Sequence, residues 1–248
     1  FRAWDQTSGT SGGTADTTAN GGTTAFSAAT DSAGITVAGV NDAPVLATGS
    51  TLAYTENQTA TAINTVITVA DVDSTTLASA AVQITGNYAS SEDVLAFTNV
   101  GMGNIAGVWN AGSGTLTLTS AGATATLAQW QAALRAVTYA NSSDSPGTAA
   151  RTVSYTVNDG ALASNTVTST VNVTAANDAP TSNDASATVA EDATSIAVTL
   201  TGSDIDGSAS QIRLASLPLN GQLYVDAGLT TLAAAGVDYA ATGQSLTL

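Results

Sequence analysis

The chain contains no cysteine and no histidine among its 248 residues, and its four basic residues are all arginine. Without these side chains it can form no disulfide, no zinc site of sulfur and imidazole ligands, no thiol nucleophile and no Ser-His-Asp triad. Basic residues are also scarce, since the chain has four Lys or Arg residues and 19 Asp or Glu residues, which gives a net charge of -15. Because neutralising phosphates requires a basic face, the composition argues against a nucleic-acid binder and against docking on anionic lipid.

Aromatic residues make up 5% of the chain and charged residues 9%, yet 44% of the residues are hydrophobic, which is enough for a folded core. No apolar run approaches the ~20 residues that cross a bilayer, so no membrane insertion is expected. The sequence starts Phe-Arg-Ala-Trp-Asp, with neither an initiator Met nor a signal-peptide pattern. We therefore expect it to be part of a longer chain.

Several motifs recur in the same order at a nearly constant spacing. The matching segments, with their offsets, are residues 41–44 and 177–180 (Asn-Asp-Ala-Pro, 136 positions), Glu56 and Glu191 (135), residues 71–73 and 204–206 (Asp-x-Asp, 133), and residues 1–5 and 155–159 (154). An enlarged loop rich in Ser, Gly and Thr at residues 7–24 accounts for the longest offset. The pattern predicts the end of one repeat at residues 1–43, a complete repeat at 44–178 and the first half of a third at 179–248.

Inside the complete repeat the local pattern is that of β-strands. Apolar and polar residues alternate along residues 153–157 and again along residues 171–174, which is the period of a strand buried on one face. Turn-forming residues at 110–114 separate two further apolar segments and predict a hairpin between residues 108–109 and 115–119. These elements indicate a β-rich domain.

One helix is expected over residues 126–135, because Leu127, Trp130 and Leu134 follow one another at spacings of three and four. Residues 137–139 then predict another strand. About seven short strands and one helical turn in roughly 135 residues are typical of an immunoglobulin-like β-sandwich. The expected fold class is therefore all-β.

The acidic residues gather in the predicted loops. In the complete repeat they lie in the joint (Asp42), after the first strand (Glu56), at the end of the second (Asp71 and Asp73) and between the last two strands (Asp159). Loops one strand apart lie at opposite ends of a sandwich, so these acids should collect at the two poles where repeats meet. Crowded carboxylates raise one another's pKa unless a cation neutralises them, and hard oxygen ligands suit Ca²⁺. The sequence thus predicts calcium between repeats.

Simpler interpretations exist for each motif. Asn-Asp-Ala-Pro fits a turn in which Pro ends the strand, Asp159-Gly160 fits a hairpin turn, and Glu56 taken alone fits a solvated strand residue. Four aromatic residues fit core or sheet-face positions better than a sugar platform: Trp109, Trp130, Tyr139 and Tyr155. The remaining acids considered are interpreted as surface charges: Asp16, Asp31, Glu92, Asp93, Asp144, Asp226 and Asp238.

Together these motifs resemble the cadherin-like, immunoglobulin-like tandem repeats of large secreted bacterial surface adhesins of the RTX type and, more distantly, the cadherins. The Asn-Asp-Ala-Pro segments look like inter-repeat linkers, Glu56 and Glu191 like the first-strand glutamate, the Asp-x-Asp pairs like the family's motif of that form, and Asp159 like the acid before the last strand. The implied fold is a set of tandem Greek-key β-sandwich repeats of about 135 residues, arranged in an elongated array.

Carried over to this sequence, the resemblance implies two calcium junctions. The first would use Asn41, Asp42, Asp71, Asp73 and Asp159. The second would use Glu56, Asn177, Asp178, Asp204 and Asp206. Cadherins add an acidic segment near the lower pole, whereas residues 126–136 contain no acid here. One or two ions per junction are therefore expected rather than three.

The resemblance implies a structural and adhesive module: a calcium-rigidified rod or fibre segment of a bacterial adhesin or matrix filament, secreted or at the cell surface. The expected partners are neighbouring repeats of the same chain, other copies in a fibre, and cell-surface glycans or proteins. The alternative is a non-catalytic domain that binds carbohydrate or protein, although such tips are usually single. An enzyme is not expected, because a carboxylate-pair glycosidase needs one active site and these acids recur in linkers.

Overall fold

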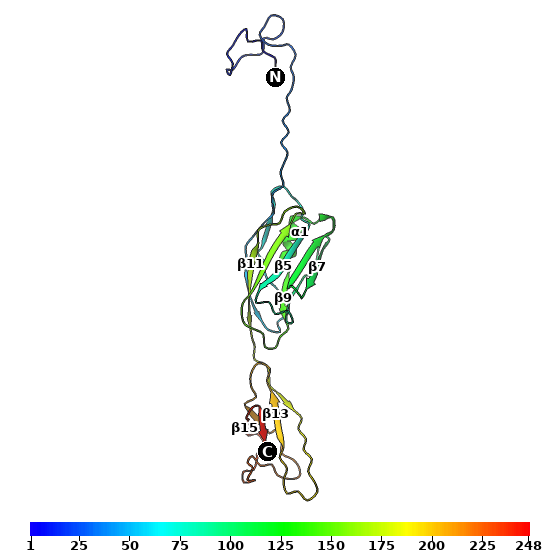
Figure 1. The fold of residues 1–248 in the computed structure, drawn as a ribbon, viewed down its shortest axis with the longest axis vertical. Helices are drawn as coiled ribbons and strands as arrows, with labels where there is room; N and C mark the ends of the chain where they lie inside the picture. Colours follow the sequence, from blue (N-terminus) through cyan, green and yellow to red (C-terminus); the bar gives the residue numbers. More distant parts are fainter. The chain divides into compact units, whose positions relative to one another are not determined.

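The computed structural model describes residues 1–248 as a mostly β protein with one short α-helix, and its internal contacts divide the chain into two units, Phe1–Val40 and Asn41–Leu248 (Figure 1). The all-β fold class predicted from the sequence is confirmed at this level. No helix has the length and apolar character required to span a membrane.

The first unit has little regular structure. Trp4 and Phe26 form an isolated antiparallel bridge. The Arg2 guanidinium donates hydrogen bonds to the carbonyls of Ser27 at 2.8 Å and Ala28 at 2.6 Å. These bonds hold the start of the chain against residues 27–28.

A curled six-stranded sheet is the largest element of the second unit, with the order β2-β11-β10-β5-β8-β7. Its strands are β2 (Thr51–Thr55), β5 (Ser79–Gly86), β7 (Ile105–Asn110), β8 (Thr115–Ser120), β10 (Arg151–Asn158) and β11 (Val167–Thr174). The expected alternating strands lie within β10 and β11, and the expected hairpin is the antiparallel pair β7–β8. Every pairing is antiparallel except β2–β11, which is parallel over five residue pairs from Thr51↔Thr170 to Thr55↔Thr174.

Two smaller sheets accompany it. One is three-stranded with the order β3-β9-β6, and the other is the antiparallel pair β1–β4. Their strands are β1 (Val45–Ala47), β3 (Thr61–Ala62), β4 (Thr68–Ala70), β6 (Asp93–Ala96) and β9 (Thr138–Asn141). Residues 45–174 thus hold eleven strands instead of about seven, because pieces of two to four residues are too short to show an alternating pattern.

One hydrophobic core joins these sheets. Val82 of β5, Leu118 of β8 and Tyr155 of β10 come from the six-stranded sheet, and they share a buried cluster with Leu95 of β6 and Tyr139 of β9. Alternate residues of β10 are buried along its whole length, as period-two patterning requires. Tyr139, Tyr155 and Trp130 are fully buried, so their predicted core positions are confirmed.

The predicted helix is confirmed as α1 (Leu127–Arg135) together with its N-cap, Thr126. The Thr126 hydroxyl accepts from the backbone N–H of Gln129, and the Gln129 side chain accepts from the backbone N–H of Thr126, which is a capping box. Trp130 points into the core, where its indole N–H donates to the Leu77 carbonyl at 3.0 Å.

The C-terminal residues form two further sheets. They comprise β12 (Thr181–Asn183), β13 (Thr199–Ser203) and β16 (Ser245–Thr247) in one sheet, and β14 (Gln211–Arg213) and β15 (Asp238–Ala240) in the other. The β1–β4 pair aligns Val45 with Ala70, and the β12–β13 pair aligns Thr181 with Ser203. These partners lie 136 and 133 positions apart, the same offsets as the linker and Asp-x-Asp motifs. The division into repeats at residues 44–178 and 179–248 stays a prediction.

Candidate metal centres

The structure brings together the five residues that the resemblance implies for the first junction. The Asn41 amide donates from Nδ2 to Oδ2 of Asp159 at 2.8 Å. The backbone N–H of Asp42 donates to Oδ2 of Asp73 at 2.9 Å, and the backbone N–H of Asp73 donates to Oδ1 of Asp71 at 3.1 Å. Asn41 and Asp42 are therefore fastened to loops far away in the sequence.

Turns after two strands set the direction of these carboxylates. Asp71 follows β4, and its Oδ1 also accepts from the backbone N–H of Ser74 at 2.8 Å. Asp159 follows β10, and its Oδ1 accepts from the N–H groups of Ala161 at 2.6 Å and Leu162 at 2.7 Å. The turn interpretation of Asp159 therefore holds, but its second oxygen still faces Asn41.

Hydrogen bonds keep these carboxylates ionised. The Asn41 amide, followed by the backbone N–H groups of Leu162 and Ala161, lowers the pKa of Asp159. Burial acts to raise the pKa of Asp71, but the backbone N–H groups of Ser74 and Asp73 outweigh it and hold the pKa below its ordinary value. Oδ2 of Asp71 is buried and has no hydrogen-bond partner. This cluster thus presents a buried oxygen that bears negative charge.

The second linker repeats the hydrogen bonds of the first. The Asn177 amide donates to the carbonyl of Asp178 at 2.7 Å, as the Asn41 amide does to the carbonyl of Asp42 at 3.0 Å. The backbone N–H of Asp178 donates to Oδ2 of Asp206 at 3.1 Å, which matches the bond from Asp42 to Asp73. Equivalent linkers therefore adopt equivalent local geometry.

Three acidic residues that the resemblance implies for the second junction lie close together. Glu56, Asp178 and Asp206 each place one carboxylate oxygen within 4.8 Å of the others. Two oxygens bound to one Ca²⁺ at 2.3–2.6 Å can lie up to about 5 Å apart, so this spacing suits a shared ion. Glu56 reaches the cluster because it directly follows β2, and its Oε1 accepts from the backbone N–H of Ala176 at 2.8 Å.

The free oxygens of this cluster are buried. Glu56 is only 5% exposed. Its Oε2 has no hydrogen-bond partner, and the same holds for one buried oxygen each of Asp178, Asp204 and Asp206. Burial raises the pKa of Asp178, and the charges of Asp144, Asp206, Glu56 and Asp204 raise it further. Buried carboxylate oxygens without donors are costly unless a positive charge faces them, so the donor set fits a hard divalent cation.

Asp144 is exposed, as its interpretation as a surface charge predicts, and its charge also raises the pKa of Asp178. It lies in the loop between β9 and β10, and its Oδ1 accepts from the Asn57 amide at 2.7 Å. Asn57 is the next residue after Glu56. No local pattern could have indicated this contact, because it joins residues 87 positions apart.

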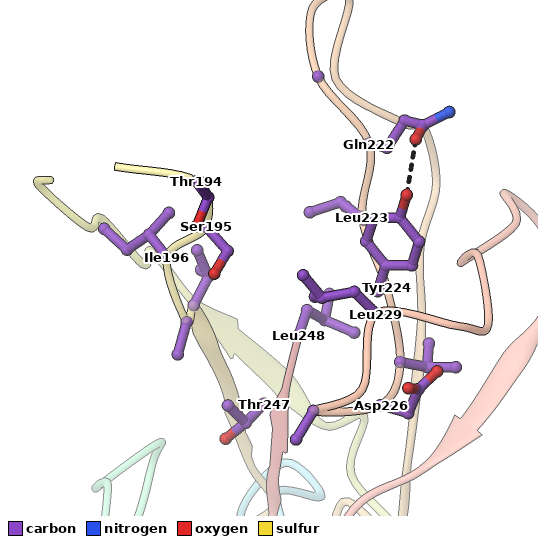
Figure 2. Close-up of a pocket in the computed structure, with 15 residues that line it drawn as sticks. Thr194, Ser195, Ile196, Gln222, Leu223, Tyr224, Asp226, Leu229, Thr247 and Leu248 are labelled. Carbon is purple, nitrogen blue, oxygen red and sulfur yellow. Dashed lines mark hydrogen bonds between the residues drawn. The ribbon is translucent and has the colours of Figure 1, made fainter. Parts of the chain in front are cut away.

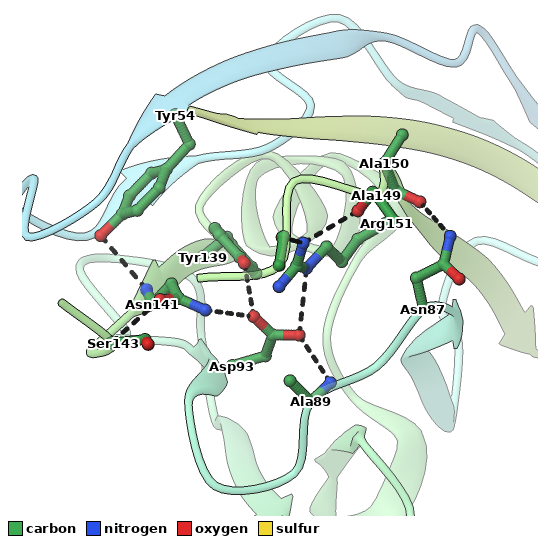
Figure 3. A network of polar contacts seen from close by, with 11 residues as sticks. Tyr54, Asn87, Ala89, Asp93, Tyr139, Asn141, Ser143, Ala149, Ala150 and Arg151 are labelled. Atoms are coloured by element: carbon green, nitrogen blue, oxygen red, sulfur yellow. Dashed lines mark hydrogen bonds and ion pairs between the residues drawn. The ribbon is translucent and has the colours of Figure 1, made fainter. Parts of the chain in front are cut away.

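Asp93 was also predicted to be a surface charge, and that prediction is wrong. Its side chain is 1% exposed and lies at the centre of a buried polar network (Figure 3). Oδ1 accepts from the hydroxyl of Tyr139 at 2.5 Å and from the Asn141 amide at 2.7 Å, while Oδ2 accepts from the Ala89 N–H at 2.9 Å and from Nε of Arg151 at 3.3 Å. Burial is tolerated because Arg151 supplies the opposite charge.

A cavity of about 580 Å³ lies elsewhere, between residues 194–198, residues 221–229 and the chain end (Figure 2). Asp226 is the one acid in its lining, and its carboxylate accepts from the backbone N–H groups of Thr230 and Thr231. These bonds lower the pKa of Asp226 to about 2. A glycosidase requires two carboxylates across the scissile bond, and this lining supplies one.

Comparison with protein-family models, with curated proteins and with solved structures found no match for this chain.

Proposed function

We propose that the chain is a structural and adhesive segment made of cadherin-like β-sandwich repeats, which Ca²⁺ bound at the linkers stiffens into a rod or fibre. In this proposal it is part of an extracellular bacterial surface adhesin or matrix filament. The observation that carries the proposal is the convergence of Glu56, Asp178 and Asp206, with their buried and unpartnered oxygens, from three separate segments.

The position of these acids explains why binding would stiffen the chain. Glu56 precedes the linker by more than a hundred residues, Asp178 is part of it, and Asp206 follows it by 28 positions. An ion held by all three joins the end of one predicted repeat to the start of the next. Without the ion, the carboxylates repel one another and the linker loosens.

The duplicated geometry supports a tandem arrangement. Both Asn-Asp linkers make the same two hydrogen bonds, and the strand pairs that follow them have matching registers. A single active site would not require such duplication, which favours a structural role over an enzyme.

Calcium titration tests the proposal. We expect millimolar Ca²⁺ to raise the thermal unfolding midpoint above its value in chelator, because an ion at 100 times its Kd adds about 2.7 kcal/mol per site to the free energy of unfolding. Small-angle scattering should report a narrower distribution of interdomain distances in Ca²⁺ than in chelator.

The variant Glu56→Gln keeps the acceptor for the Ala176 N–H and removes one charge, so it should lose much of the calcium-dependent stabilisation. Glu92→Gln is the matched control, since it removes an equal charge from a side chain outside both clusters. Identical midpoints in Ca²⁺ and chelator for the wild-type chain would contradict the proposal.

A further inference from the structure

Strand β7 is one of the two edges of the six-stranded sheet (Figure 1). It pairs with β8 along its whole length, and no strand of the chain pairs with its other side. Three consecutive residues at its centre, 106–108, are exposed, whereas β8 buries every second residue. Both faces of β7 are therefore accessible at its centre, next to an open edge.

The backbone of β7 directs hydrogen-bonding groups toward this open side. The Ile105 carbonyl accepts from the Asn99 amide at 2.7 Å, and the N–H of Ser120, which lies opposite Ile105 in β8, donates away from β7 to the segment before β5. In an antiparallel pair, residues alternate between bonding to the partner strand and pointing away from it. Gly107 and Trp109 therefore direct their N–H and C=O groups outward, as Ile105 does. A further strand could bond to these groups.

The usual protection of an edge strand is missing from β7. Exposed edges are commonly protected by charged side chains, by Pro, by a bulge or by being very short. β7 has six residues, none of them charged and none of them Pro, and its register with β8 is continuous. The opposite edge, β2, is better protected, because the Gln58 side chain accepts from the N–H of Thr55 at 3.2 Å and charged Glu56 follows directly. β7 is thus the edge to which another strand can add.

The distribution of charge favours a second copy of this chain as that strand. Residues 94–143 contain no Asp or Glu and one charged residue, Arg135, although the net charge of the chain is -15. Two copies repel each other where their acidic residues approach, and β7 and β8 both lie within the acid-free segment. A basic partner would instead be attracted to the acids elsewhere and would gain nothing from β7.

We infer that β7 is a self-association edge, at which two copies of this chain pair antiparallel and join their six-stranded sheets. The contact is symmetric, so the same strand serves both copies. With Val108 facing Val108 of the second copy, Gly107 of each copy exchanges both backbone hydrogen bonds with Trp109 of the other. Val108 is 69% exposed and gains a β-branched cross-strand neighbour in this register. The inference adds a surface to the fibre proposed above and does not depend on the calcium sites.

Sedimentation velocity of the full chain at a fixed Ca²⁺ concentration measures the association. We expect a monomer–dimer equilibrium at about millimolar protein, because a contact smaller than a standard interface binds weakly. Raising NaCl from about 0.1 M to about 1 M should strengthen it, since salt screens the repulsion between two copies of like charge. An interface held by ion pairs would weaken instead.

Two lysine variants locate the interface. Val108→Lys places two like charges opposite each other in the dimer and should raise its Kd by about tenfold or more. Asn172→Lys is the matched control, because it makes the same change of charge at an exposed position of β11, away from the open edge, and should leave Kd unchanged. Both positions are exposed, so the unfolding midpoints of the two variants should match that of the wild-type chain.

The absence of cysteine allows the register to be tested by cross-linking. Facing residues in this register have Cα atoms about 4.5 Å apart, which is within the range of a disulfide. Val108→Cys should therefore form covalent dimers in oxidised glutathione. Ala106→Cys is the control on the same strand: it is also exposed, but it faces Asn110 of the second copy, so its two thiols are too far apart to meet and should link much more slowly.

The outcomes that would overturn the inference are distinct from those that test calcium. A chain that stays monomeric at millimolar concentration in 1 M NaCl overturns it, and so does Val108→Lys that dimerises as strongly as the wild-type chain, or equal linking of the two Cys variants. If the chain stays monomeric but binds an added peptide of alternating Thr and Val, the edge recruits a foreign strand and a second copy is the wrong occupant. The calcium function is decided separately, by the unfolding midpoints in Ca²⁺ and in chelator.

Discussion

Replacing Arg151 with Met tests how much the buried ion pair with Asp93 contributes to stability. Arg151 is 2% exposed, and it is the partner of Asp93 in an ion pair whose side chains are 2% and 0% exposed. Met fills a similar volume along the same path, but it leaves the Asp93 carboxylate charged, buried and facing only neutral donors.

The expected loss follows from the contacts. Breaking one partner of a buried ion pair costs about 3–5 kcal/mol, because the remaining charge is uncompensated. Tyr139, Asn141 and Ala89 still donate to Asp93 and place the cost toward the lower end of that range. Typical domains have free energies of unfolding of about 5–15 kcal/mol. The variant should therefore remain folded, with a much smaller free energy of unfolding than the wild-type chain.

Urea unfolding in chelator, followed by Trp fluorescence and far-UV circular dichroism, measures the change. With a slope of about 1–3 kcal/mol/M, a loss of 3 kcal/mol lowers the urea midpoint by at least about 1 M. The double variant Asp93→Asn with Arg151→Met removes the stranded charge and should recover part of the stability. A loss under about 1 kcal/mol in the single variant, or no recovery in the double one, would refute the reasoning.

Two other predictions concern the space beside two exposed glycines and the ionisation of two buried tyrosines. Gly49→Ala should destabilise the fold severely, because a Cβ there would lie 2.1 Å from the carbonyl oxygen of Thr168, whereas Gly147→Ala meets nothing within 4 Å and should leave the urea midpoint nearly unchanged; equal midpoints would contradict this. Burial raises the pKa of Tyr139 and Tyr155 above the ordinary 10.0, so the folded chain keeps both protons where the unfolded chain loses them. Stability should therefore be full below about pH 10 and fall above it by up to about 1.4 kcal/mol per pH unit for each tyrosine. Tyr155→Phe should halve that slope, and urea midpoints that stay constant from pH 8 to 11 would contradict the sign.

Strand and helix patterns were predictable where the signal is local. Alternate residues of β10 are buried, and the alternation is visible in its sequence. The helix α1 was predictable from its apolar spacing alone. In contrast, nothing local indicates that β2 and β11 run parallel, because the alternation of a strand carries no information about the direction of its neighbour.

The positions of the acidic residues could also be predicted only in part from the local sequence. The resemblance to cadherin-like repeats placed Glu56, Asp178 and Asp206 in one junction, and the structure brings their oxygens together. Asp93 sits in a polar stretch after Ser90, Ser91 and Glu92, so local sequence suggests exposure; its burial depends on Arg151, 58 positions away. Contacts of this range depend on the tertiary fold and leave no mark in the local pattern.

The parallel pairing of β2 with β11 also has a mechanical consequence. β2 begins shortly after Asn41 and Asp42 and the sheet ends with β11, so a pull on the chain at either side of residues 45–174 loads β2 and β11 from opposite ends. Parallel strands pulled in this way are loaded in shear, and the hydrogen bonds along all five residue pairs must yield together. A strand pair loaded from one end would instead open one bond at a time. This pairing therefore resists extension of residues 45–174 by shear along its whole length.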